Sequence, residues 1–65
     1  MNEMNVFDGI TGQFLYYGKF DEAKAREELE KGNAVQIFDR STNEPVRNTR
    51  SYSIRTDENG FASLL

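Results

Sequence analysis

The chain has 65 residues, of which 29% are charged and 37% hydrophobic, and its formal net charge is −3. It contains no cysteine and no histidine, which excludes disulfide bonds, thiolate nucleophiles, and both the commonest general base and the commonest metal ligand. We therefore expect a protein that is not an enzyme and that uses no cofactor or metal. The length predicts one domain over residues 1–65, close to the lower size limit for unaided folding.

The chain has no apolar run that approaches the length of a membrane span, and no charged-then-apolar leader at its start. These features predict a cytoplasmic protein without a membrane partner. We expect residues 1–3 to fray, as chain termini commonly do.

The first elements predicted along the chain form a β-hairpin. Met4–Asp8 is typical of a strand, and the loop that follows contains Gly12, which suits a positive φ angle. Phe14–Lys19 is the predicted returning strand. Simple alternation places Phe14 and Tyr16 on one of its faces.

A helix is predicted over Phe20–Gly32. Asp21 is a favourable N-cap, and Gly32 suits the left-handed residue that often ends a helix. Leu29 is the only large apolar residue of the helix. A helix this polar must pack on the apolar face of another element, and we expect Leu29 to anchor it there.

Strand signals return after the helix. Ala34–Asp39 predicts a strand, Pro45 fits a strand start or a sheet edge, and Val46–Thr56 predicts one long polar strand or two shorter ones. The tail Phe61–Leu65 either packs on the core or forms an exposed motif for a partner, and we expect packing. Together the segments predict an α+β fold in the order ββαββ, with a possible fifth strand over 51–56. One helix then lies on a mainly antiparallel sheet.

Two parts of the sequence resemble each other: residues 6–15 align without gaps to residues 37–46. Asp8 matches Asp39, and Gly12 matches Asn43, which also tolerates positive φ. The match indicates either two equivalent sites or the same hairpin chemistry used twice. We favour the second interpretation because aspartate has a sufficient local role in turns.

Charge is unevenly distributed along the chain. Residues 40–56 carry four arginines against Glu44 alone, a local charge of +3, so the remaining residues carry −6. Arginine suits planar contacts with phosphate or carboxylate groups. The candidate partner-binding residues are therefore Arg40, Arg47, Arg50, Tyr52 and Arg55.

Three functional hypotheses follow. The first is a small non-enzymatic protein-binding or regulatory module, with another protein as partner. The second is a nucleic-acid-binding module that uses the Arg-rich region 40–56, although the acidic composition weighs against it. The third is a self-associating structural protein, with a homodimer as its simplest form.

Overall fold

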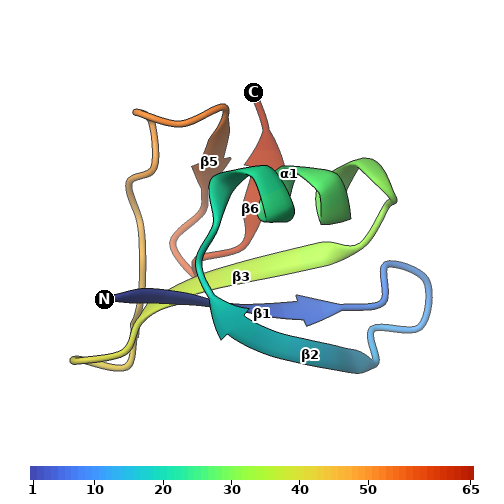
Figure 1. The fold of residues 1–65 in the computed structure, drawn as a ribbon, viewed down its shortest axis with the longest axis horizontal. Coiled ribbons are helices and arrows are strands. Elements are labelled where there is room, and N and C mark those ends of the chain that lie inside the picture. The colour runs from blue at the N-terminus through green and yellow to red at the C-terminus, as the bar shows by residue number, and fades with distance from the viewer.

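A hairpin, a helix and four further strands follow one another along the chain (Figure 1). The computed structural model describes all residues 1–65. Its elements are β1 (Asn2–Phe7), β2 (Phe14–Lys19), α1 (Glu22–Glu30), β3 (Ala34–Asp39), β4 (Glu44–Pro45), β5 (Ile54–Thr56) and β6 (Ala62–Leu64). The predicted α+β class is confirmed. The helix is too short and too polar to cross a membrane.

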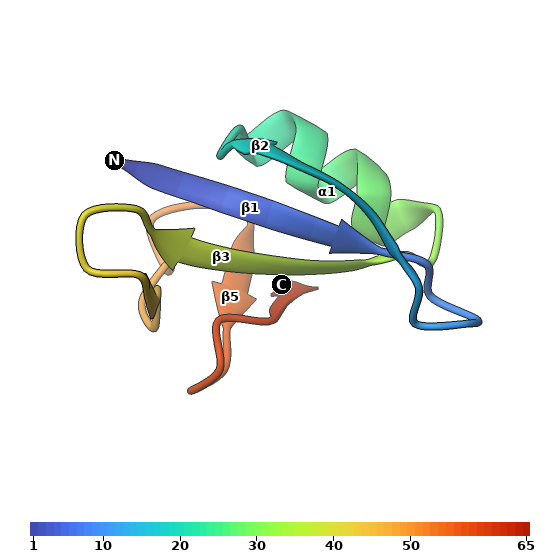
Figure 2. The same ribbon diagram turned by 90° about the horizontal axis from the view of Figure 1, so that it is seen from below.

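The main sheet is antiparallel, with the strand order β2-β1-β3-β4. Figure 2 shows β2, β1 and β3 side by side, with α1 on their far side. Strands β5 and β6 form a second, two-stranded sheet. It joins the first through a bridge between Gln36 and Phe61 and a 2.8 Å hydrogen bond from the Ile37 N–H to the Gly60 carbonyl.

The N-terminal residues lie at the centre of the sheet. Asn2 and Glu3, which we expected to fray, belong to β1, where Glu3 pairs with both Lys19 and Phe38. The Asn2 carbonyl also accepts a 3.0 Å hydrogen bond from the Phe20 N–H. A terminal strand with neighbours on both edges has its backbone groups paired, which opposes the expected fraying of these residues.

The core lies between the main sheet, α1 and β5. Its fully buried members are Met4, Val6, Ala25, Val35, Ile37 and Ile54. The helix contributes Ala25, whereas Leu29, the predicted anchor, is only partly buried. A methyl side chain lets the helix lie close to the sheet, so the position closest to the core suits alanine better than leucine.

The predicted N-cap Asp21 and the left-handed Gly32 are confirmed, and α1 itself runs from Glu22 to Glu30, two residues shorter at each end than the predicted segment. The Asp21 side chain accepts a 3.1 Å hydrogen bond from the Lys24 N–H, and Gly32 has a φ of 91°. The β1–β2 loop closes against this helix end at Gly9. A Cβ atom on Gly9 would lie 1.6 Å from the Gly32 carbonyl oxygen, so the approach requires glycine.

The two aligned hairpin turns use the same chemistry. The Asp8 carboxylate accepts hydrogen bonds from the Ile10 and Thr11 N–H groups, and Asp39 accepts two from Ser41. These bonds, led by the Thr11 N–H at Asp8 and the Ser41 hydroxyl at Asp39, lower the pKa of both carboxyls. Positive φ angles recur at Gly12 (74°) and Asn43 (59°). The turns follow opposite ends of the β1–β3 pair, which supports a local turn role over a joint site.

The segment Val46–Thr56 does not form one long strand. Only Ile54–Thr56 is strand, as β5, and its partner β6 comes from the tail, where no strand was predicted. Ser53 is held by the helix: its N–H donates to Glu22 at 3.4 Å, and its carbonyl accepts from Arg26 at 3.2 Å. Contacts distant in sequence therefore override the β-propensity of this segment.

Candidate functional site

The five predicted partner-binding residues are distributed over the β3–β4 turn, the β4–β5 connection and β5. Arg40 donates to Glu3 at 2.9 Å, a contact that raises the pKa of the guanidinium, and the Nε of Arg55 donates to the Ser63 hydroxyl at 3.3 Å. The Tyr52 ring packs edge-on against Phe20 with centroids 5.5 Å apart. Arg47 and Arg50 lie in the connection between β4 and β5, and neither forms an ion pair.

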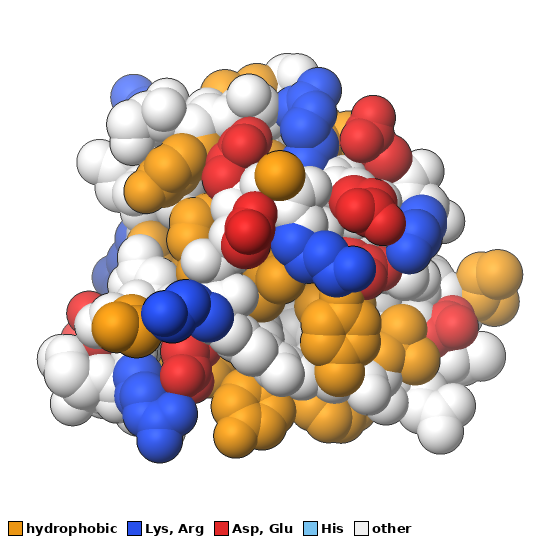
Figure 3. All heavy atoms as spheres, in the orientation of Figure 1, with side chains coloured by type: hydrophobic (Ala, Val, Ile, Leu, Met, Phe, Trp, Pro, Cys, Tyr) orange, Lys and Arg blue, Asp and Glu red, His pale blue; other side chains and the backbone are white.

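The basic region is a path along the side of the molecule. In Figure 1 the chain climbs from the β3–β4 turn, past the N-terminus, to the upper end of β5. Figure 3 shows red and blue side chains mixed over α1, without a continuous blue area on that face. Residues 46–53 of this region form an irregular connection with turns instead of the predicted strand.

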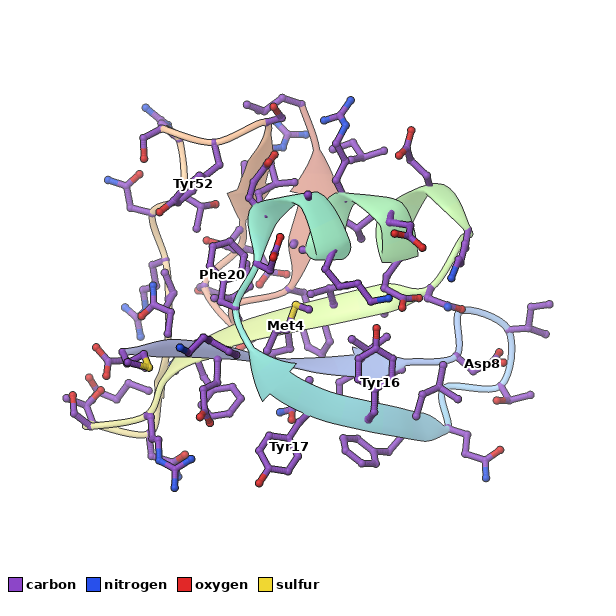
Figure 4. All side chains as sticks on the ribbon, viewed as in Figure 1. Met4, Asp8, Tyr16, Tyr17, Phe20 and Tyr52 are labelled. Carbon is purple, nitrogen blue, oxygen red and sulfur yellow. The ribbon has the colours of Figure 1, made fainter.

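A bulge in β2 creates a surface that the sequence pattern does not predict. Phe7 pairs with Phe14 and Val6 with Tyr16, which leaves Leu15 without a partner. Phe14 and Tyr16 therefore face opposite sides of the sheet, and the predicted shared face is wrong. In Figure 4, Tyr16 points towards α1 and Tyr17 points away from it.

Aromatic rings collect on the side of the sheet opposite α1. We define the aromatic face as Phe7, Phe14, Tyr17 and Phe61. The Phe7 ring centroid lies 5.8 Å from that of Phe14 and 6.1 Å from that of Phe61. Phe14 is 51% exposed, Tyr17 60% and Phe61 38%. No helix or strand lies below the sheet in Figure 1, so these rings meet solvent.

Polar and charged groups complete the aromatic face. Asn5 lies between Tyr17 and Gln36 in the strand register, and its side chain makes no hydrogen bond within the chain. Lys19 and Glu3 are paired positions at the far end of the face. Glu3 forms its ion pair with Arg40, and Lys19 forms none. The surface therefore combines the rings of Phe7, Phe14 and Phe61 with the unpaired amide of Asn5 and the unpaired ammonium group of Lys19.

Sequence reasoning found part of this surface. Strand alternation correctly places Asn5 and Phe7 on the same face of β1. It misplaces Phe14, because a bulge shifts the register without a proline or glycine at the bulge to mark it. Phe61 joins the face only through the non-local bridge to Gln36, which no local pattern signals.

A buried carboxylate lies on the opposite side of the sheet. Glu28 of α1 is only 4% exposed and accepts hydrogen bonds from the Tyr16 hydroxyl and, at 3.0 Å, from the Asn33 amide. The Asn33 side chain also accepts from the Gly9 N–H at 3.3 Å. This cluster ties helix, β2 and the first loop together. The Tyr16 bond, followed by the Asn33 bond, lowers the pKa of Glu28.

The same cluster makes stability depend on pH at the alkaline end. Burial, with the hydrogen bond to Glu28, raises the pKa of Tyr16 to about 12 from an ordinary 10.0. The stabilisation is therefore complete below pH 10.0 and is lost as pH rises towards 12. We expect Tyr16→Phe to cost about 1.5–3 kcal/mol at neutral pH and to flatten this alkaline decline. Urea unfolding at a series of pH values measures both effects, and an unchanged alkaline decline would contradict the assignment.

At the acidic end, the contribution of Glu28 to the free energy of unfolding depends on pH in the opposite direction. Because the folded-state pKa of Glu28 lies below its ordinary 4.5, its contribution is present above pH 4.5 and is lost as the pH falls through the folded value.

No cluster of three or more acidic side chains is arranged to hold a metal ion. We assign the Glu28 cluster a structural role because its hydrogen bonds are all internal.

Comparisons of the chain with protein-family models, with curated proteins and with solved structures gave no match.

Proposed function

We propose that the chain is a small non-enzymatic protein-binding module and that the aromatic face is its binding surface. One observation carries the proposal: Phe14, Phe7 and Phe61 form a continuous row of rings on the uncovered side of the sheet. Contiguous exposed apolar groups on small proteins often mark interaction sites. Aromatic side chains are also enriched among the residues that dominate binding energy.

The aromatic face defines the chemistry of its partner. A polypeptide segment would place one or two large apolar side chains against Phe14 and Phe61. A backbone or amide group would bond to the free side chain of Asn5, and a carboxylate would meet the unpaired ammonium of Lys19. Such an apolar centre with a polar end is typical of protein–protein interfaces.

Single-stranded nucleic acid is the second candidate partner, and the same rings support it. Exposed aromatic rings on a sheet can stack bases, and Asn5 offers a hydrogen-bonding edge. Only Lys19 and Arg40 supply positive charge there, and Arg40 is already bound to Glu3. A net charge of −3 further disfavours a polyanion, so we rank a protein partner first.

Selection of random peptides displayed on phage against the full chain tests the first candidate. We expect the selected peptides to contain large apolar residues with a nearby acidic residue, and to shift the backbone NMR signals of Phe7, Phe14 and Phe61. Phe14→Ser should weaken their binding at least about tenfold, as loss of an exposed aromatic contact residue does. Leu65→Ser is the matched control, because Leu65 is 67% exposed but lies outside the aromatic face.

Two results would overturn this assignment. Selected peptides that bind Phe14→Ser as tightly as the parent chain would place the binding surface elsewhere. A random single-stranded oligonucleotide that binds at about 50 mM salt, is released at about 200 mM, and is lost in Phe14→Ser would move nucleic acid to first place.

A further inference from the structure

Strand β2 has the only long unpaired edge in the molecule. It lies at one end of the main sheet, and the opposite end is β4, which has two residues, one of them Pro45. Strands β5 and β6 have three residues each, whereas β2 has six. An open edge of this length offers a row of backbone donors and acceptors to another strand.

The hydrogen bond from the Phe20 N–H to the Asn2 carbonyl fixes which groups point outward. In an antiparallel pair, hydrogen-bonded and non-hydrogen-bonded positions alternate. Gly18 and Tyr16 therefore bond to β1, while Tyr17 and Lys19 direct their N–H and C=O groups away from it.

We propose that two copies of the chain associate through their β2 edges, antiparallel, around a two-fold axis at Tyr17. This register joins Tyr17 to Tyr17 of the partner subunit by two reciprocal backbone hydrogen bonds. It also places Lys19 opposite Leu15 of the partner subunit. The two main sheets then become one continuous sheet, and the aromatic faces of the two copies adjoin. The contact is made by the edge of β2, and it shares Tyr17 with the aromatic face.

The side chains fit this register on both faces. On the aromatic face, two tyrosines that are each 60% exposed become a cross-strand pair, a favourable aromatic arrangement. On the other face, Tyr16 lies opposite Gly18 of the partner subunit. No atom lies within 4 Å of the position of a Cβ on Gly18, so a neighbouring ring has room to cover it. An aromatic side chain across from a strand glycine stabilises the pairing.

The charges favour the antiparallel arrangement. Lys19 is the only charged residue of β2. In the proposed register, the two Lys19 backbones lie four positions apart along the strands, or about 14 Å. This separation exceeds the Debye length of about 8–10 Å at moderate salt. A parallel, in-register pairing would set the two ammonium groups side by side, so the charges select a second copy in the antiparallel direction.

The size of the contact predicts a weak, reversible dimer. Phe14, Leu15 and Tyr17 are each about half exposed and together offer on the order of 300 Å² of apolar surface per copy. Stable interfaces bury roughly 800 Å² per partner. The dimer should therefore form in the upper micromolar to millimolar range rather than at trace concentration.

Sedimentation equilibrium with charge-reversal variants tests the proposal. We expect the mass of the parent chain to rise from 7.5 kDa towards twice that value between about 10 μM and 1 mM, a range that brackets a weak dissociation constant. Tyr17→Glu and Tyr17→Lys should each weaken association at least about tenfold, because each sets two like charges directly opposite one another. An equimolar mixture of the two variants should associate again, because position 17 of one variant then lies opposite position 17 of the other and the two charges have opposite sign.

The corresponding mixture of Ile10→Glu and Ile10→Lys is the matched control, because Ile10 is 97% exposed and lies outside β2. These variants should dimerise as the parent chain does, alone or mixed. A monomeric parent chain at about 1 mM would overturn the proposal. So would Tyr17 variants that dimerise separately, or a Tyr17 mixture no heavier than its components.

Discussion

The Ile37→Ala variant is expected to lose about 2–5 kcal/mol of its free energy of unfolding. A core of this size rarely supplies more than about 3–5 kcal/mol in total, so most of the variant should be unfolded. Ile37 is completely buried in β3 opposite Met4. Its N–H donates to Gly60 and its carbonyl accepts from Val46. The deleted side-chain carbons therefore leave a cavity in the core between the main sheet, α1 and β5.

Urea unfolding followed by circular dichroism measures this loss. Ile10→Ala is the matched control: it makes the same chemical change at a residue that is 97% exposed, so its effect should stay within about 0.5 kcal/mol. Equal stability of the two variants would refute the core assigned here.

The Gly9→Ala variant is expected to lose about 3 kcal/mol, through overpacking. The new methyl group would lie 1.6 Å from the Gly32 carbonyl oxygen and 2.6 Å from the Gly32 carbonyl carbon. Both are backbone atoms at the end of α1, and no flexible side chain can move aside. The loop must withdraw, which breaks the hydrogen bond from Gly9 to Asn33 and disturbs the Glu28 cluster.

Gly18→Ala separates this clash from the general effect of removing a glycine. Gly18 has no atom within 4 Å of its Cβ position and does not have positive φ. Its replacement should change the free energy of unfolding by less than about 1 kcal/mol. Thermal unfolding of both variants makes the comparison. Similar melting temperatures would mean that the loop does not contact the helix end as described.

Local signals predicted the parts of the fold that local chemistry determines. Asp21 caps the helix, Gly12 and Gly32 adopt positive φ, and the aspartates close their turns, because each needs only neighbouring residues. The α+β class and the central helix could be predicted from these local signals.

The remaining features depend on residues distant in sequence. Ser53 bonds to Glu22 and Arg26 of the helix, next to the turns that stand in place of the predicted long strand. Phe61 reaches the aromatic face through Gln36. No periodicity within β2 reveals its bulge. The aromatic face is formed by pairing between strands that are distant in sequence. The predicted Arg-rich site depended only on the composition of residues 40–56.

The central position of β1 determines the order of events when the chain folds. Its inner partner β3 lies about thirty residues later, with Asn2 opposite Asp39 and Phe7 opposite Ala34. The β1–β2 hairpin and α1 are local and can form early, but the β1–β3 ladder closes the longest loop in the main sheet, a step that entropy slows. Val35 and Ile37, which lie beside Val6 and Met4 in the buried row of the sheet, therefore join their partners late in folding. Until this ladder forms, Met4 and Val6 lack part of their apolar surroundings, and transiently exposed side chains of this kind favour aggregation.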